Sequence, residues 1–266
     1  MKNLLVLLTI ILCAGTIVLG NFHWKSKISA EGEKAATSGK TEVEIDKTEE
    51  KNKGFEEIEL YMSNLPKEIQ NKIKSSYEKK KPLHLVIYGS ESTSKDPGAW
   101  PDLLKQELNS TYGKDTFEVT VLSEEGKTTS DTVNEELYEV VNELQADIIL
   151  YEPAMLKDNS QLVGTDNTLE NIDIILESWS ARNENVTILI QPPHPLYNAK
   201  FYPKEVEKLR EHAEQNDLIY LNHWENWPEI DNEELRGLVT EERNKPSQLG
   251  NEVWAGYLGE YFVGGN

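Results

Sequence analysis

The chain of 266 residues is 38% hydrophobic and 28% charged, enough material for one compact domain of ordinary size with appendages. Its net charge of -20 excludes a nucleic-acid partner, because affinity for the phosphate backbone comes largely from clustered lysines and arginines. Cys13 is the only cysteine, which excludes disulfides, cysteine nucleophiles and zinc sites built on cysteine clusters.

The first 24 residues form a segment of their own. A lysine precedes an uncharged, largely apolar stretch, Leu4 to Gly20, whose length is close to the lower limit of about 17 residues for a membrane-spanning helix. We expect residues 1–24 to be a signal peptide or a membrane anchor, and Phe22 and Trp24 favour the anchor because aromatic side chains suit the membrane interface. Both alternatives predict an extracytoplasmic protein, anchored to or secreted at a bacterial cell surface.

Two further segments precede the main domain. Residues 25–54 predict a flexible stalk, because they are rich in Glu, Lys, Thr, Ser and Gly and too poor in apolar residues to form a core. Residues 55–81 predict a helical lead-in, in which Pro66 suits the first turn of a helix and apolar residues recur every fourth position from Ile69. The main domain is expected at residues 82–266.

In the main domain, short apolar runs alternate with amphipathic stretches. Runs typical of buried strands occupy residues 83–88, 117–122, 147–151, 186–190 and 218–221. Helical spacing occupies residues 100–108, 132–144, 169–179, 203–215 and 252–262. Strands separated by single helices need crossover connections, which produce a parallel sheet covered on both faces. We therefore predict an α/β fold, a three-layer sandwich around a mostly parallel, flavodoxin-like sheet of five strands.

The residues that follow each strand are the candidates for a functional site, because ligands of such sheets bind at the carboxyl ends of the strands. Ser90, Glu91 and Ser92 follow the first strand, while His194 and His223 follow the fourth and fifth. We expect the bend near residue 90 and the loop near residue 245 to meet over one rim of the sheet. No Gly-x-Gly-x-x-Gly turn and no Walker-type loop occurs, so the sequence predicts no nucleotide cofactor.

At residues 82–262 the order of these blocks resembles the SGNH or GDSL hydrolase superfamily. The stretch Lys245-Pro246-Ser247 through Gly250, followed by Val253-Trp254-Ala255, is similar to that family's closing His-Pro-Asn, Gly and Trp-Ala pattern. The resemblance implies a flavodoxin-like sandwich and hydrolysis of an ester or acyl group. The chain is therefore expected to be a divergent, membrane-tethered member with an altered nucleophile block and an altered Asp-x-x-His block.

The resemblance also implies roles for individual residues. The nucleophile falls on Ser92 or on Ser90, depending on how the turn is aligned, and Lys245 stands where the family has its general-base histidine. A histidine, His223 or His194, could replace that base, or both could be packed side chains. The remaining expected roles are Glu242 as the acid, Gly126 and Asn159 as oxyanion residues, and Glu91 and His194 as substrate-binding residues.

Two functions of different classes follow from these expectations. The first is an exported esterase or deacylase that acts on an acylated envelope polysaccharide or lipid, without a cofactor or a metal. The second is an inactive descendant of the same fold that binds a cell-wall glycan or an assembly partner. The oligomeric state is left open.

Overall fold

The structure, a computed structural model, describes residues 58–264. Its centre is a five-stranded sheet of β1 (Leu83–Gly89), β2 (Phe117–Ser123), β3 (Ile148–Glu152), β4 (Thr187–Ile190) and β5 (Ile219–Tyr220). The strands lie in the order β2-β1-β3-β4-β5, and every neighbouring pair is parallel. This confirms the predicted α/β class and the parallel sheet.

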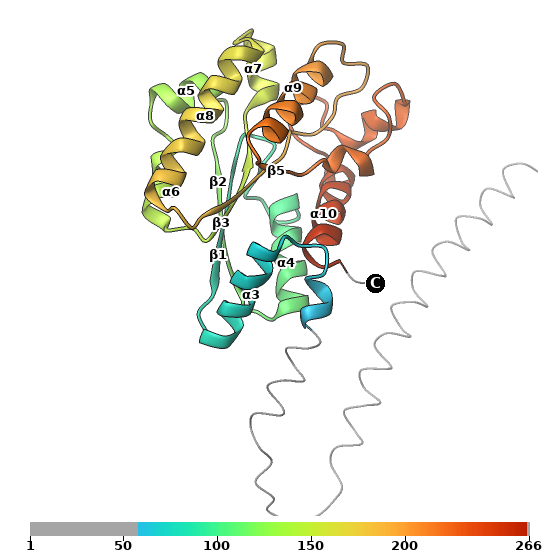
Figure 1. Ribbon diagram of the computed structural model, residues 1–266. Coiled ribbons are helices and arrows are strands. Elements are labelled where there is room, and N and C mark those ends of the chain that lie inside the picture. Colours follow the sequence, from blue (N-terminus) through green and yellow to red (C-terminus); the bar gives the residue numbers. More distant parts are fainter. Residues whose placement is uncertain (1–57, 265–266) are drawn as a thin grey trace, which may run out of the picture. The chain divides into compact units, whose positions relative to one another are not determined.

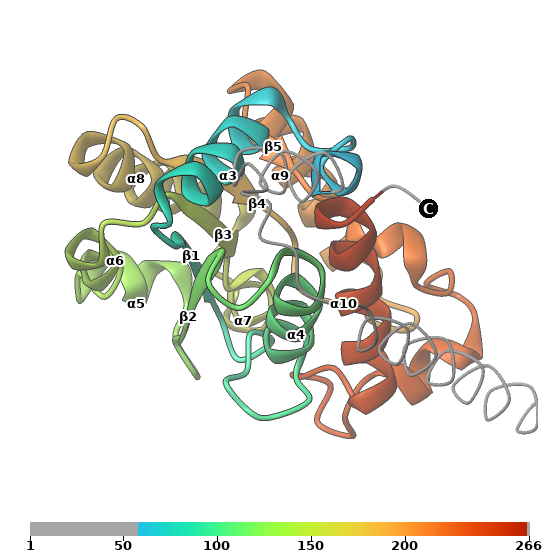
Figure 2. The same ribbon diagram turned by 90° about the horizontal axis from the view of Figure 1, so that it is seen from below.

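Helices cover both faces of the sheet. One face packs against α3 (Lys67–Lys79), α4 (Trp100–Tyr112) and α10 (Gln248–Phe262), and the other packs against α6 (Glu139–Leu144), α8 (Thr165–Arg182) and α9 (Tyr202–Gln215). Figure 2 shows α4 and α10 on the opposite side of the strands from α6 and α8. The three-layer arrangement is therefore as predicted.

The alternation of side chains along the strands explains why the core has two halves. In β1, Leu85 and Ile87 belong to the core under α4 and α10, while Val86 and Tyr88 belong to the core under α8 and α9. Successive strand residues point to opposite faces, so a strand that is buried on both faces is mostly apolar along its length. This is why the buried strands could be recognised as continuous apolar runs.

Two helix predictions need correction. The helix expected at residues 132–144 is two short helices, α5 (Thr129–Asn134) and α6, separated by a turn in which Glu136 has a left-handed φ of 55°. Thr128 also starts α5 earlier than expected, because it forms a capping box with Asp131. A further helix, α7 (Met155–Gln161), occupies a stretch for which the apolar spacing predicted no helix.

The remaining elements are short. Two 3-10 helices, η1 (His223–Asn226) and η2 (Glu233–Leu238), lie between β5 and α10. In the expected helical lead-in, residues 58–61 are helical and α3 begins directly after Pro66. The predicted signal peptide or anchor and the stalk lie outside the described residues. Among residues 58–264, no helix is both long and apolar enough to cross a membrane.

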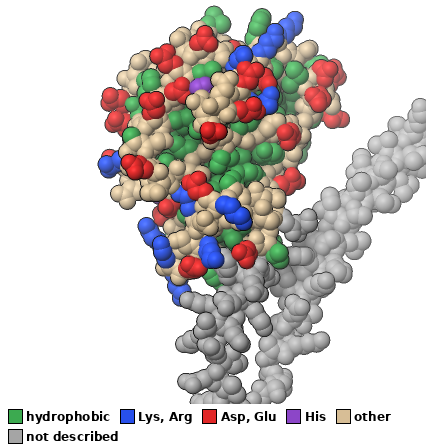
Figure 3. All heavy atoms as spheres, viewed as in Figure 1, with side chains coloured by type: hydrophobic (Ala, Val, Ile, Leu, Met, Phe, Trp, Pro, Cys, Tyr) green, Lys and Arg blue, Asp and Glu red, His purple; other side chains and the backbone are tan. Residues whose placement is uncertain are grey.

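The chain's acidic excess is visible on the surface of the domain. Figure 3 shows Asp and Glu side chains scattered over the visible face, with Lys and Arg side chains both at the end that carries α3 and at the opposite end. Figure 1 shows α7 at the other end of the sheet. That other end is where the parallel strands finish and where the candidate site lies.

Candidate functional site at the carboxyl ends of the strands

A cavity of about 590 Å³ lies at the carboxyl ends of the strands. Ser90, Glu91 and Ser92 line it from the turn after β1, and Asn244 lines it from the loop before α10. The two segments are in contact, because the Asn244 side-chain amide donates to the Glu91 carboxylate at 2.6 Å and the Ser92 hydroxyl is 3.5 Å from the Asn244 carbonyl. The structure thus brings the bend near residue 90 and the loop near residue 245 together, as the sequence predicts.

Ser92 is paired with a histidine. Its Oγ lies 3.1 Å from Nδ1 of His194, which is in the loop after β4. His194 is fully buried, and burial lowers its pKa to about 3, an effect only partly offset by the Arg243 carbonyl. The imidazole is therefore neutral at physiological pH and can accept a hydrogen bond from the hydroxyl, but the same burial makes it a weak base. No carboxylate contacts His194 among the described residues, and its Nε2 has no hydrogen-bond partner there.

Ser90 is bound to a buried carboxyl group instead. Its hydroxyl lies 2.9 and 3.0 Å from the two carboxyl oxygens of Glu152, and its backbone N–H donates to Glu152 at 2.8 Å. Thr93 adds a third donor at 2.8 Å. Glu152 is completely buried, and this burial raises its pKa to about 8 in spite of the three donors.

His223 is a packed side chain. Its ring stacks on Trp254 with centroids 4.0 Å apart, its Nδ1 accepts from Trp227, and its Nε2 donates to the Pro192 carbonyl at 2.8 Å. Because both ring nitrogens are engaged, His223 has no lone pair to offer a serine in this geometry. The candidate base that contacts a serine is His194, which the sequence offers both as an alternative base and as a substrate-binding residue.

Lys245 and Glu242 lie apart from the serines. The Lys245 ammonium donates to Glu125 at 3.0 Å, and both side chains are partly exposed. Glu242 is exposed and lines the cavity, but it forms no hydrogen bond with the serine turn among the described residues. The relay predicted from Glu242 and Lys245 is therefore not assembled in this structure, because the lysine has its own partner at the surface.

The two predicted oxyanion residues are not aimed at Ser92. Gly126, with a left-handed φ of 74°, lies beyond the end of β2 and does not line the cavity. Asn159 lines the cavity from α7, but its amide donates to both carboxylate oxygens of Glu205, at 3.1 and 3.0 Å. Glu91, expected to bind substrate, does line the cavity, where Lys157 lies 3.9 Å from its carboxylate.

Three residues of the site were not selected from the sequence, namely Thr93, Glu152 and Asn244. Glu152 carried a usable signal, because a glutamate at the end of an otherwise apolar central strand must be either solvated or paired. The Asn244 contacts join segments that are 152 or more residues apart, so no local pattern could have indicated them.

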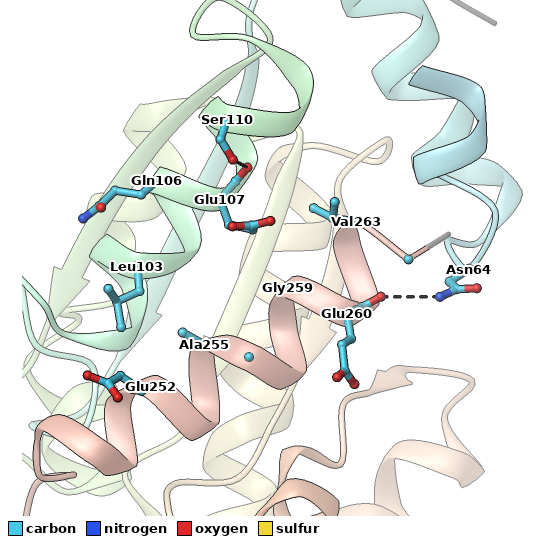
Figure 4. Close-up of a pocket in the computed structure, with 12 residues that line it drawn as sticks. Asn64, Leu103, Gln106, Glu107, Ser110, Glu252, Ala255, Gly259, Glu260 and Val263 are labelled. Carbon is cyan, nitrogen blue, oxygen red and sulfur yellow. Dashed lines mark hydrogen bonds between the residues drawn. The ribbon is translucent and has the colours of Figure 1, made fainter. Parts of the chain in front are cut away.

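A larger cavity, about 1,030 Å³, lies between α4 and α10. Figure 4 shows that Leu103 and Glu107 line it from one helix and Ala255 and Glu260 from the other, with Asn64 at one end. Its lining contains no histidine, and its one hydroxyl, that of Ser110, donates to the Glu107 carbonyl. The larger cavity is therefore not the candidate site, and the smaller one is lined by the serine turn after β1.

Known proteins resemble this chain in structure but not in sequence. No family model matches the sequence, and no curated protein matches it. Solved structures do match. One is a lipolytic protein of the G-D-S-L family from Desulfitobacterium hafniense, at 19% identity and a TM-score of 0.53, covering 67% of this chain and 99% of that protein. The chain has the SGNH/GDSL hydrolase fold.

Two esterases share this SGNH/GDSL fold with the chain. One is a carbohydrate esterase of family 3 from Talaromyces cellulolyticus, at 12% identity and a TM-score of 0.58, covering 68% of this chain and 96% of that protein. Another is a catalytic mutant of Axe2, an acetylxylan esterase from Geobacillus stearothermophilus, at 14% identity and a TM-score of 0.55, covering 70% and 96%. At these identities the likeness establishes the SGNH/GDSL fold, and the chemistry must be argued from the site.

Proposed function

We propose that the protein is an SGNH-type esterase or deacylase in which Ser92 is the nucleophile and His194 is the base. The observation that carries this proposal is the separation of 3.1 Å between Ser92 Oγ and His194 Nδ1 beside a cavity at the carboxyl ends of the strands. A serine hydroxyl is a weak nucleophile unless a neighbouring base accepts its proton, and a neutral imidazole within hydrogen-bond distance meets that need.

The reaction follows from this pair. Ser92 Oγ attacks the carbonyl carbon of an ester while its proton passes to Nδ1 of His194, and the ester C–O bond breaks as that proton is returned to the departing alcohol. Water then attacks the acyl-serine by the same proton path and releases the acid. We expect slow turnover, because burial disfavours the imidazolium that forms on His194 and no carboxylate of the described residues supports it.

The substrate is proposed to be an acylated cell-envelope polysaccharide or lipid outside the cytoplasm. The fold is shared with two carbohydrate-directed esterases, and the apolar stretch before the stalk is typical of an exported or anchored protein. Phe201, 72% exposed, contributes an aromatic face to the lining of the cavity, and Lys157 and Asn159 contribute polar groups. An aromatic face beside polar groups suits a sugar ring.

Ester hydrolysis by the full chain tests the proposal. Release of acetate from acetylated xylan and of nitrophenol from a short-chain nitrophenyl ester is measured for the wild type, for Ser92→Ala and for Ser94→Ala. Ser94 is the matched control, because its hydroxyl pairs with Asp96 and does not line the cavity. We expect loss of hydrolysis in Ser92→Ala alone, and equal rates in the wild type and Ser92→Ala would refute the assignment.

A second candidate function is binding of a glycan or an assembly partner without turnover. It is favoured by a specific observation, which is that His194 lacks an acidic partner while Lys245, at the position of the family's base, is engaged with Glu125. This alternative predicts that folded protein retains acetylated polymer without releasing acetate.

A further inference from the structure

The turn that carries Ser92 is held by a buried carboxyl group. Glu152, at the end of β3, is paired in register with Gly89, the last residue of β1. Its carboxyl oxygens accept hydrogen bonds from the Ser90 N–H, the Ser90 hydroxyl and the Thr93 hydroxyl, at 2.8 to 3.0 Å. Gly89 leaves the room for this approach, because a Cβ there would lie 2.3 Å from Thr93 Oγ1 and 2.6 Å from Glu152 Oε2.

The same contacts extend to Ser92. Its backbone N–H donates to the Ser90 hydroxyl oxygen at 3.2 Å, and its carbonyl accepts from the Trp100 indole at 2.9 Å. The position of Ser92 therefore depends on where the Ser90 hydroxyl lies, and Glu152 fixes that hydroxyl. The Ser92 Oγ in turn faces His194.

We propose that Glu152 is a positioning residue for Ser92: by anchoring Ser90 and Thr93 it holds the turn so that Ser92 Oγ faces His194. This inference rests on the proposed esterase function. Glu152 does not touch Ser92 itself and takes no proton in the reaction. A reacting group displaced by about 1 Å can lose on the order of a hundredfold in rate, so a rigid turn has a direct kinetic effect.

The location of Glu152 favours a specific role over simple packing. The four preceding residues of β3, Ile148 to Tyr151, are apolar and buried, and Glu152 is buried as completely as they are. Burial of a carboxyl group is unfavourable unless its hydrogen bonds are satisfied, and here burial raises its pKa. An apolar residue would fill the space without that cost, but it would leave the donors of Ser90 and Thr93 unpaired.

Four variants of the full chain test the proposal. Glu152→Leu removes the acceptors, Glu152→Gln keeps one acceptor oxygen, and Thr93→Val removes a single donor with little change in volume. Thr168→Val is the matched control, because it removes a 2.7 Å bond from a buried hydroxyl to another buried carboxylate, Asp158, that does not contact the serine turn. If Glu152→Leu does not fold, Thr93→Val carries the test.

The first readout is the rate of labelling by a fluorophosphonate probe. We expect Glu152→Leu and Thr93→Val to react roughly tenfold or more slowly than the wild type, whereas Glu152→Gln and Thr168→Val stay within about threefold. Wild-type rates in Glu152→Leu and Thr93→Val would overturn the proposal. An equal loss of rate in Thr168→Val would also overturn it, because stability alone would then explain the effect.

The second readout separates this proposal from the proposed function. The ring-nitrogen spectrum of His194, assigned with a His194→Gln variant, reports its contact with Ser92 whether or not the protein reacts. We expect Glu152→Leu and Thr93→Val to move this spectrum toward that of Ser92→Ala. A wild type that is not labelled would refute the esterase function, and an unchanged His194 spectrum in these variants would refute the role of Glu152.

Discussion

Replacement of the Glu152 carboxyl by an amide should change how the stability of the domain depends on pH. Burial raises the pKa of Glu152 from 4.5 to about 8. Between these two values the folded state holds a proton that the unfolded state has released, so rising pH favours unfolding. At about 1.4 kcal/mol per pH unit, a difference of about 3.5 pH units corresponds to about 5 kcal/mol, which is large against a total of about 5–15 kcal/mol for a typical domain.

The assay is urea unfolding of the wild type and Glu152→Gln at a series of pH values from about 5 to 9. The difference in unfolding free energy between the two proteins isolates Glu152, because the other titrating groups are common to both. The groups near it that carry charge or titrate, Glu91, Tyr151 and Tyr202, remain in place. We expect the unfolding free energy of the wild type to fall relative to that of Glu152→Gln as the pH rises toward 8. Above pH 8 the difference between the two proteins should stay constant.

Two results would contradict this reasoning. A difference that stays constant within about 1 kcal/mol from pH 5 to 9 would mean that Glu152 titrates alike in the folded and unfolded states. A difference of the opposite sign would mean that the three donors outweigh burial and hold Glu152 as a carboxylate.

Three further substitutions test the surroundings of the site. Gly89→Ala should destabilise the domain by about 1–3 kcal/mol or more in urea unfolding, because its Cβ would overlap the contacts of Glu152, whereas Gly237→Ala, which has open space, should have little effect. His223→Phe should lower the melting temperature, because each of the two buried polar groups it leaves unpaired costs about 1–3 kcal/mol, while probe labelling stays at the wild-type rate. Lys245→Met should change stability by less than about 1 kcal/mol, because its ion pair is partly exposed, and should leave labelling unchanged.

Each of these three predictions has an outcome that would contradict it. A stable Gly89→Ala variant would show that the turn can move away from Glu152. Loss of labelling in a folded His223→Phe or Lys245→Met variant would restore the base role that the sequence assigned to these residues.

The sheet could be predicted because burial acts along contiguous residues. Strands β1 and β3 are enclosed on both faces, so their sequences are mostly apolar, with His84 and Glu152 as exceptions. The helical stretches between the strands indicated crossover connections and hence the parallel arrangement. The helix between β2 and β3 was misjudged because apolar spacing continues from Val133 to Leu144, while the backbone breaks at Glu136. The spacing of apolar residues indicates which face of a helix is buried, but it does not show where the backbone leaves the helical conformation.

The site could be predicted only in outline. That hydroxyls of the first turn would meet the loop before the last helix followed from the rule that ligands bind at the carboxyl ends of parallel strands. Which serine meets which histidine depends on side-chain packing: Ser92 and His194 are 102 residues apart, and His223 is withdrawn by its stack on Trp254. The resemblance put Lys245 at the position of the family's general base, but the structure pairs this lysine with Glu125 at the surface.

The most direct test of the central claim is to react the full chain with a fluorophosphonate probe and map the modified residue by mass spectrometry. If Ser92 and His194 form a nucleophile and its base, the label is found on Ser92, and it disappears in Ser92→Ala and in His194→Gln. A label on Ser90, or folded protein that acquires no label, would contradict the account.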